Sequence, residues 1–126
     1  MNRGGRRFFR WKAAFLFFLP LALHAQPFPT SSRPTPGEFV TEMPPRVSIM
    51  FDSELETRTS KIVVINDRGA QISGDFGDVS EIDRKLLVAK IDRSAAANAK
   101  GHYLVHWEVT ARNGHRSQGN FDFTLQ

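Results

Sequence analysis

The chain contains no cysteine, and this absence excludes several kinds of chemistry together. Disulfide bonds, thiolate metal ligands, cysteine nucleophiles and c-type haem attachment all require that residue. Exported domains often use disulfides, but a domain of about 100 residues can fold without them. We therefore expect the fold to depend on a hydrophobic core alone.

The chain also lacks an apolar run of the roughly 20 residues that a membrane-spanning helix needs. Its longest run, residues 13–23, is short and contains Pro20. This run ends just before the small residue Ala25, and it follows a basic segment that contains Arg3, Arg6, Arg7, Arg10 and Lys12. Such an order is typical of a secretory signal peptide.

We predict that residues 1–25 are a signal peptide cleaved after Ala25. The exported domain, residues 26–126, is then periplasmic and not embedded in the membrane. An uncleaved N-terminal anchor is the alternative. The pair Arg6 and Arg7 leaves the twin-arginine export route open beside the general secretory route.

Positive charge is scarce once the predicted signal is removed. The full chain has 17 Lys and Arg against 13 Asp and Glu. Five of the cations lie in residues 1–25, so residues 26–126 keep 12 cations against 13 anions, a net charge of −1. Because no basic stripe remains, we expect no nucleic-acid partner.

The remaining sequence has the pattern of a β protein. Six of the seven prolines lie in residues 26–45, which predicts extended or looped chain with an edge strand at most. Further along, apolar residues alternate with polar ones over residues 47–51, 103–109 and 121–125, and short apolar runs occupy 62–65 and 86–91. Short strands separated by turn residues predict an all-β, immunoglobulin-like sandwich of about seven strands. The turn at Asn113-Gly114 is expected to belong to a connection of seven or more residues, longer than a tight hairpin.

The alternation assigns faces to the aromatic residues. Successive side chains of a strand point to opposite faces, so we expect an inner set of large residues in the core. That set comprises Phe51, Val105, Trp107, Phe121 and Phe123. The opposite face of the strand around Trp107 is expected to be solvated.

That solvated face carries His102, His106 and Glu108. At about 3.3 Å per residue, the two histidines lie about 13 Å apart and cannot chelate one ion. His106 and Glu108 remain an alternative metal pair if another strand contributes. The acidic segment around Asp75 and Asp78 is expected to be a solvated loop, because it lacks the spacing of a calcium-binding loop.

No pattern of a nucleophilic or phosphate-binding enzyme is present. The chain has no Gly-x-Ser-x-Gly motif, no Ser-His-Asp arrangement and no glycine-rich phosphate loop. We therefore expect a protein that is not an enzyme.

The last part of the chain carries a specific motif. From Trp107 to Phe123 the sequence contains W-x-V, then Asn113-Gly114-His115, then G-x-F-x-F. This segment resembles the C-terminal signature of the CopC-like periplasmic copper-resistance proteins. Residues 31–37, 45–53 and 101–105 are similar to that family as well, so the resemblance covers nearly all of residues 26–126. It implies a small Greek-key β-sandwich.

The resemblance also implies a Cu(II) site with one histidine preserved. His115 stands at the family's loop histidine, whereas Asn113 replaces the aspartate two places earlier. Gln26 stands where the family has an N-terminal histidine, and Asp52 is adjacent to Ser53 at the place of a carboxylate. Cu(II) favours tetragonal nitrogen and oxygen donors. The resemblance thus predicts a degenerate Cu(II) site with these four residues as ligands.

Neighbouring residues set limits on that site. Arg112 and Arg116 flank His115, and a nearby cation lowers metal affinity. The family's thioether-rich Cu(I) loop is missing, because residues 26–126 contain only Met43 and Met50. The predicted function is copper handling, tolerance or delivery to an inner-membrane copper transporter. The alternative is a structural or protein-interaction module of the cell envelope that has lost the copper site.

Overall fold

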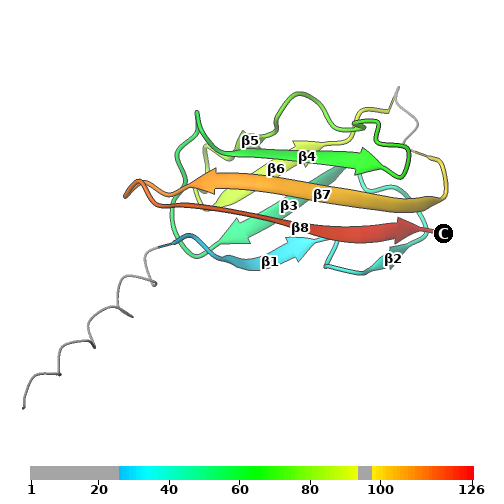
Figure 1. Ribbon diagram of the computed structural model, residues 1–126, viewed down its shortest axis with the longest axis horizontal. Helices are drawn as coiled ribbons and strands as arrows, with labels where there is room; N and C mark the ends of the chain where they lie inside the picture. Colours follow the sequence, from blue (N-terminus) through cyan, green and yellow to red (C-terminus); the bar gives the residue numbers. More distant parts are fainter. Residues whose placement is uncertain (1–25, 94–97) are drawn as a thin grey trace, which may run out of the picture.

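The computed structural model describes residues 26–93 and 98–126, which form two four-stranded β-sheets (Figure 1). The predicted signal peptide, residues 1–25, lies outside them. One sheet has the strand order β1-β3-β6-β5 and the other β2-β8-β7-β4. The strands are β1 Pro29–Arg33, β2 Phe39–Val40, β3 Arg46–Phe51, β4 Lys61–Asn66, β5 Asp78–Val79, β6 Leu86–Lys90, β7 Gly101–Thr110 and β8 Arg116–Leu125.

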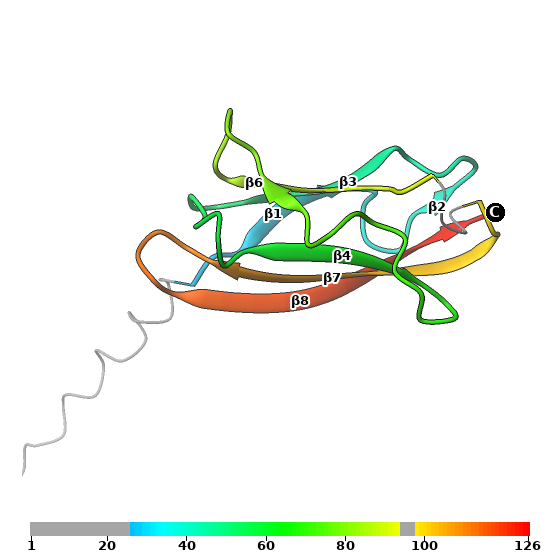
Figure 2. The same cartoon turned by 90° about the horizontal axis from the view of Figure 1, so that it is seen from above.

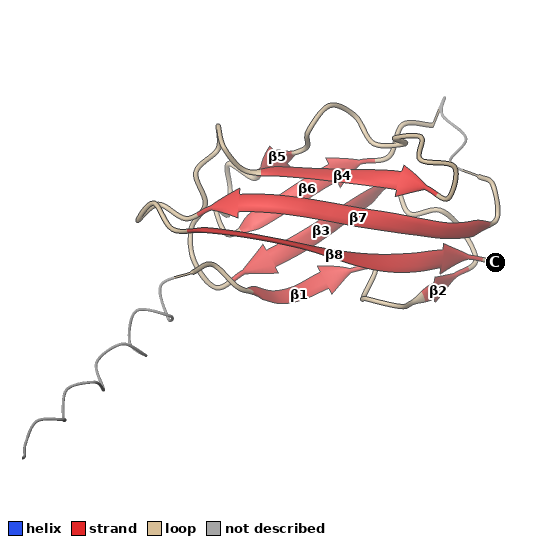
Figure 3. Ribbon diagram, in the orientation of Figure 1, coloured by secondary structure: helices blue, strands red, loops and turns tan. Residues whose placement is uncertain are grey.

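The two sheets form separate layers with the core between them (Figure 2). Period-two alternation decides which side chains face that core, as β3 and β7 show. Val105, Trp107 and Val109 of β7 are buried, and the residues between them lie on the outer face. The predicted all-β sandwich is confirmed, and Figure 3 shows strands and loops throughout the described chain. No helix among the described residues is long and apolar enough to cross a membrane.

The predicted core residues are buried with one exception. Phe51, Val105 and Phe123 are at most 1% exposed, and Trp107 is 8% exposed. Phe121 is only partly buried at the margin of the core. The rings of Phe51 and Trp107 meet edge to face at a centroid distance of 5.1 Å, which joins the two sheets. Trp107 is therefore the core tryptophan of the sandwich.

Strands β7 and β8 form one long hairpin, and the connection between them, residues 111–115, is shorter than the seven or more residues expected. Ten residues pair on each side, from Gly101 with Leu125 to Thr110 with Arg116. The alternation of β8 is hidden near its start because its half-buried positions there are Ser117 and Gly119 rather than apolar residues. Small residues at inward positions do not produce the hydrophobic pattern by which strands are recognised.

Two very short strands were not expected. β2, in the proline-rich segment, pairs parallel with the end of β8. β5, which lies in the acidic segment, pairs antiparallel with β6 through Asp78 and Val79. Two-residue strands carry too little sequence for a period to be read. The described residues form eight strands where about seven were expected, and six of the eight are longer than two residues.

Candidate metal centre

The predicted ligands come from segments that meet at one end of the sandwich. β3 and β7 end there and β1 and β8 begin there (Figure 1). Gln26 precedes β1, Asp52 follows β3, and Asn113 and His115 lie in the loop between β7 and β8. Tertiary structure therefore brings the ends of three distant segments to one region of the surface.

Two of the predicted ligands share a hollow. Gln26 and Asp52 line an open depression of about 550 Å³, together with Trp107. Ser117 and Gln118 of β8 form another part of its wall. Asn113 and His115 are not among the residues that line it. The structure thus brings Gln26 and Asp52 to one hollow and leaves Asn113 and His115 outside its lining.

Asp52 has a structural task in this arrangement. Its carboxylate Oδ1 accepts a hydrogen bond from the backbone N–H of Phe28 at 2.9 Å. The backbone N–H of Asp52 donates in return to the carbonyl of Phe28 at 3.0 Å. The Ser53 hydroxyl also donates to the same carboxylate oxygen, at 3.3 Å. One oxygen of Asp52 is therefore already engaged in holding the chain segment before β1.

Asn113 is similarly engaged. Its side-chain Oδ1 accepts the backbone N–H of His115 at 3.0 Å, which closes an Asx turn. Gly114 follows with a φ of +93°, a backbone conformation that side chains disfavour. The carbonyl of His115 accepts from the N–H of Ala111 at 2.8 Å. The turn is therefore well defined, and the amide oxygen of Asn113 helps to define it.

The imidazole of His115 is not engaged in this way. His115 is exposed, and within residues 26–93 and 98–126 its ring makes no hydrogen bond or ion pair. An exposed ring with both nitrogens available is able to turn toward a metal ion. In this respect His115 differs from Asp52 and Asn113, whose side-chain oxygens accept backbone N–H groups.

The two flanking arginines differ in a way that the sequence did not indicate. Arg112 forms an ion pair with Glu54 at 3.0 Å and lies 3.9 Å from Glu56. Its charge is therefore largely balanced by these two carboxylates. In the described part of the chain, Arg116 has no such carboxylate partner. The expected repulsion of a metal ion at His115 thus falls mainly to Arg116.

The histidines of the outer sheet face occupy two separate networks. Nδ1 of His102 lies 3.0 Å from the hydroxyl of Thr124. Nδ1 of His106 lies 2.7 Å from Oδ1 of Asn120, and its Nε2 lies 3.3 Å from Oε2 of Glu108. Both nitrogens of His106 therefore have partners already. This arrangement agrees with the solvated polar face that the alternation predicted.

The donor chemistry fits a weak copper site rather than a complete one. The described residues contain no group of three or more histidine, cysteine, aspartate or glutamate side chains that could hold a metal ion. The described acidic segment around Asp75 and Asp78 contains no such group either. A Cu(II) ion at this end would depend on His115, on the free oxygen of Asp52 and on the amino group of Gln26 if that residue begins the mature chain.

Sequence reasoning missed the β8 residues beside the hollow. The hydroxyl of Ser117 donates to the carbonyl of Pro27 at 2.8 Å, which fastens the N-terminal segment to β8. These two residues lie 90 positions apart in the chain. No local pattern indicates such a contact, because it depends on which strands become neighbours.

The sandwich has a counterpart in a known family. The sequence matches the CopC domain over residues 29–126. This match covers most of the chain, so the protein belongs to the CopC domain family. The sequence resemblance noted in the last two strands is thereby confirmed.

Several named proteins and solved structures are also similar to this chain. Protein YobA of Escherichia coli K12 is 25% identical over 97 residues, which are 77% of this chain and 76% of YobA. The YobA protein of Shigella flexneri matches to the same extent. Among solved structures, CopC from Methylosinus trichosporium OB3b superposes with a TM-score of 0.70 at 21% identity, covering 79% of this chain and 93% of that one. PcoC, a methionine-rich copper resistance protein from Escherichia coli, gives 0.62 at 20% identity, covering 81% and 100%. These structures share the fold of this chain.

Proposed function

We propose that this protein is a periplasmic copper-binding protein that takes part in copper handling or tolerance. The observation that carries the proposal is the CopC domain match over residues 29–126, which includes the loop with His115. Two solved members of similar fold are a CopC and a copper resistance protein. We further propose that the protein delivers copper to an inner-membrane transporter.

The residues define what kind of copper site this would be. His115 supplies one imidazole nitrogen, and Asp52 supplies one carboxylate oxygen that is free of the Phe28 N–H. The amino group of Gln26 supplies a second nitrogen if cleavage follows Ala25 and the glutamine does not cyclise. Asn113 is the poorest donor, because its oxygen is neutral and already accepts the N–H of His115. We expect modest affinity that falls as pH is lowered, since both nitrogens must be unprotonated to bind.

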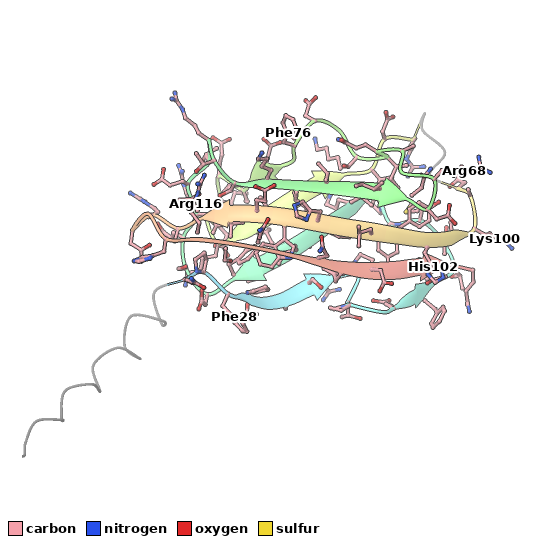
Figure 4. The ribbon with its side chains drawn as sticks, viewed as in Figure 1. Phe28, Arg68, Phe76, Lys100, His102 and Arg116 are labelled. Atoms are coloured by element: carbon pink, nitrogen blue, oxygen red, sulfur yellow. The ribbon has the colours of Figure 1, made fainter. Side chains whose placement is uncertain are left out.

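The test is titration of residues 26–126 with Cu(II), followed by calorimetry and by the electron paramagnetic resonance spectrum of the bound ion. His115→Ala should abolish the specific site. His102→Ala is the matched control, because it removes an exposed histidine of the same hairpin at its opposite end (Figure 4). An affinity no better than that of a free histidine peptide would exclude the copper-carrier function.

A second candidate function has its own support. Oδ1 of Asp52 and Oδ1 of Asn113 both serve the structure of the chain, as they would in a domain without a metal. The protein would then be a structural or protein-interaction module of the envelope. Loss of copper affinity on changing His106 but not His115 would support neither function as stated, and would move the metal to the sheet face.

A further inference from the structure

Three cationic side chains gather around a second hollow, on the outer side of the sheet β2-β8-β7-β4. Arg58, Lys61 and Arg116 line an open depression of about 540 Å³. Ser117 and Gln118 belong to its wall as well as to that of the candidate metal centre, so the two hollows are neighbours. Figure 4 labels Arg116 at this end of the hairpin, far from Arg68.

The three cations reach the hollow from different parts of the fold. Arg58 precedes β4, Lys61 is its first residue, and Arg116 is the first residue of β8. Strand register aligns them: Lys61 is opposite Glu108 on β7, and Arg116 is opposite Thr110. The paired sheet therefore holds at least two of the positive charges at set positions around β7.

These charges are not balanced by carboxylates. None of the three cations forms an ion pair in the part of the chain that the structure describes. The ammonium Nζ of Lys61 lies over the ring of Phe76, 5.6 Å from its centroid. Glu108 is the one carboxylate of the lining, and its Oε2 lies 3.3 Å from His106. The hollow thus carries a net positive charge. Its cations differ from Arg112, whose charge is balanced by Glu54.

Polar groups able to bind an anion complete the lining. Thr59 and Thr110 contribute hydroxyls, and Gln118 contributes an amide. Oγ1 of Thr110 is buried and has no hydrogen-bond partner among the described residues. A buried hydroxyl without a partner is uncommon and calls for an explanation such as a ligand or a water molecule.

We propose that this hollow binds a phosphate-type oxyanion. Arginine guanidinium groups donate two parallel hydrogen bonds to phosphate oxygens, and lysine adds a point charge. The volume of about 540 Å³ falls within the range of about 300–1,000 Å³ that small-molecule sites have. The phosphate group is either a free ion or part of a phospholipid headgroup at the membrane surface. This proposal is independent of copper binding.

The experiment uses residues 26–126 at low ionic strength with a chelator present, so that no metal takes part. One arm follows backbone amide shifts on titration with inorganic phosphate. The other measures sedimentation with vesicles of phosphatidylglycerol, compared with phosphatidylcholine. We expect binding in at least one arm: phosphate alone indicates a free ion, and anionic vesicles alone indicate a headgroup. Binding in neither arm would overturn the proposal.

Variants distinguish binding at this site from nonspecific attraction of anions to the positive charges of the surface. The double change Arg58→Gln, Arg116→Gln should weaken binding at least about tenfold, because it removes two charge-assisted contacts. Arg68→Gln, an exposed arginine at the opposite end, should alter it less than about twofold. Glu108→Gln should strengthen binding by removing the opposing carboxylate. Thermal unfolding measurements confirm that each variant is folded. If the double variant and Arg68→Gln weakened binding equally, the site would be refuted.

Discussion

The indole ring of Trp107 lies directly over Gly119, with no room for a side chain between them. A Cβ atom placed on Gly119 would come within 2.5 Å of Cζ2 of Trp107 and within 2.9 Å of Cε2. The two residues are paired across β7 and β8. The absence of a side chain on β8 is therefore what allows the tryptophan to lie flat beside it.

Gly119→Ala should consequently destabilise the domain. The indole is buried against Phe51 and cannot shift freely, so overpacking is expected to cost about 1–3 kcal/mol. Urea unfolding measures this difference. Gly74→Ala is the matched control, because nothing lies within 4 Å of its Cβ position and it should change stability little. Equal effects of the two substitutions would show that Trp107 is not confined by Gly119.

Trp107→Ala should be among the most destabilising single changes. It removes a ring that is only 8% exposed and its edge contact with Phe51, and truncations of this kind cost about 3–5 kcal/mol. That loss is a large share of the stability of a domain of this size. His102→Ala, on the exposed face of the same strand, should cost under about 0.5 kcal/mol. A loss below about 1 kcal/mol for Trp107→Ala would contradict the assigned core.

Tyr103 should make stability fall in alkaline solution. Its burial, and then the nearby charge of Asp67, raise the pKa of the phenol above the ordinary value of 10.0. The folded state therefore keeps its proton at pH values where the unfolded chain ionises. The contribution of Tyr103 is complete below pH 10 and is lost as pH rises through the folded pKa.

Tyr103→Phe isolates this effect. The variant loses the hydrogen bond from the hydroxyl to the carbonyl of Ala99, at a cost of about 1 kcal/mol near neutral pH. The ring still stacks on Phe123, at a centroid distance of 5.5 Å. The unfolding free energies of the wild-type protein and of Tyr103→Phe are measured below and above pH 10. The difference between the two free energies should shrink as pH rises. A constant difference across that range would refute the raised pKa.

Processing at Ala25 decides which residue begins the exported protein. We expect intact-mass measurement of the periplasmic protein to give a chain that starts at Gln26, with or without the loss of ammonia that marks cyclisation. A start at His24 would instead supply an N-terminal histidine with two nitrogen donors. Copper affinity of the chain that starts at His24 should then exceed that of residues 26–126.

Local sequence was sufficient to predict those parts of the fold that depend on the alternation of side chains along a strand. The faces of β3 and β7 follow from alternation alone, because each successive side chain of a strand points the opposite way. The burial of Phe51 and Trp107 could thus be predicted. The start of β8 could not, because its inward positions are Ser117 and Gly119. Ser117 bonds to Pro27, in the segment before β1, and Gly119 lies against Trp107 of β7.

The candidate metal centre was predictable only as a set of residue types. The family resemblance pointed to His115, but the engagement of Asp52 with Phe28 and of Arg112 with Glu54 depends on which loops meet. Those loops belong to segments far apart in the chain. Their meeting requires the strand order of both sheets, which no local pattern contains.

The sequence by itself determined that this chain is an all-β domain of the CopC type, because strand periodicity and a family motif are both local properties. Only the tertiary structure decided how the two hollows are built. Arg58 and Lys61 join Arg116, and Gln26 joins Asp52, because strand pairing across the sandwich brings them together. Charge balance and ligand geometry depend on distances in space, and residues distant in sequence set those distances.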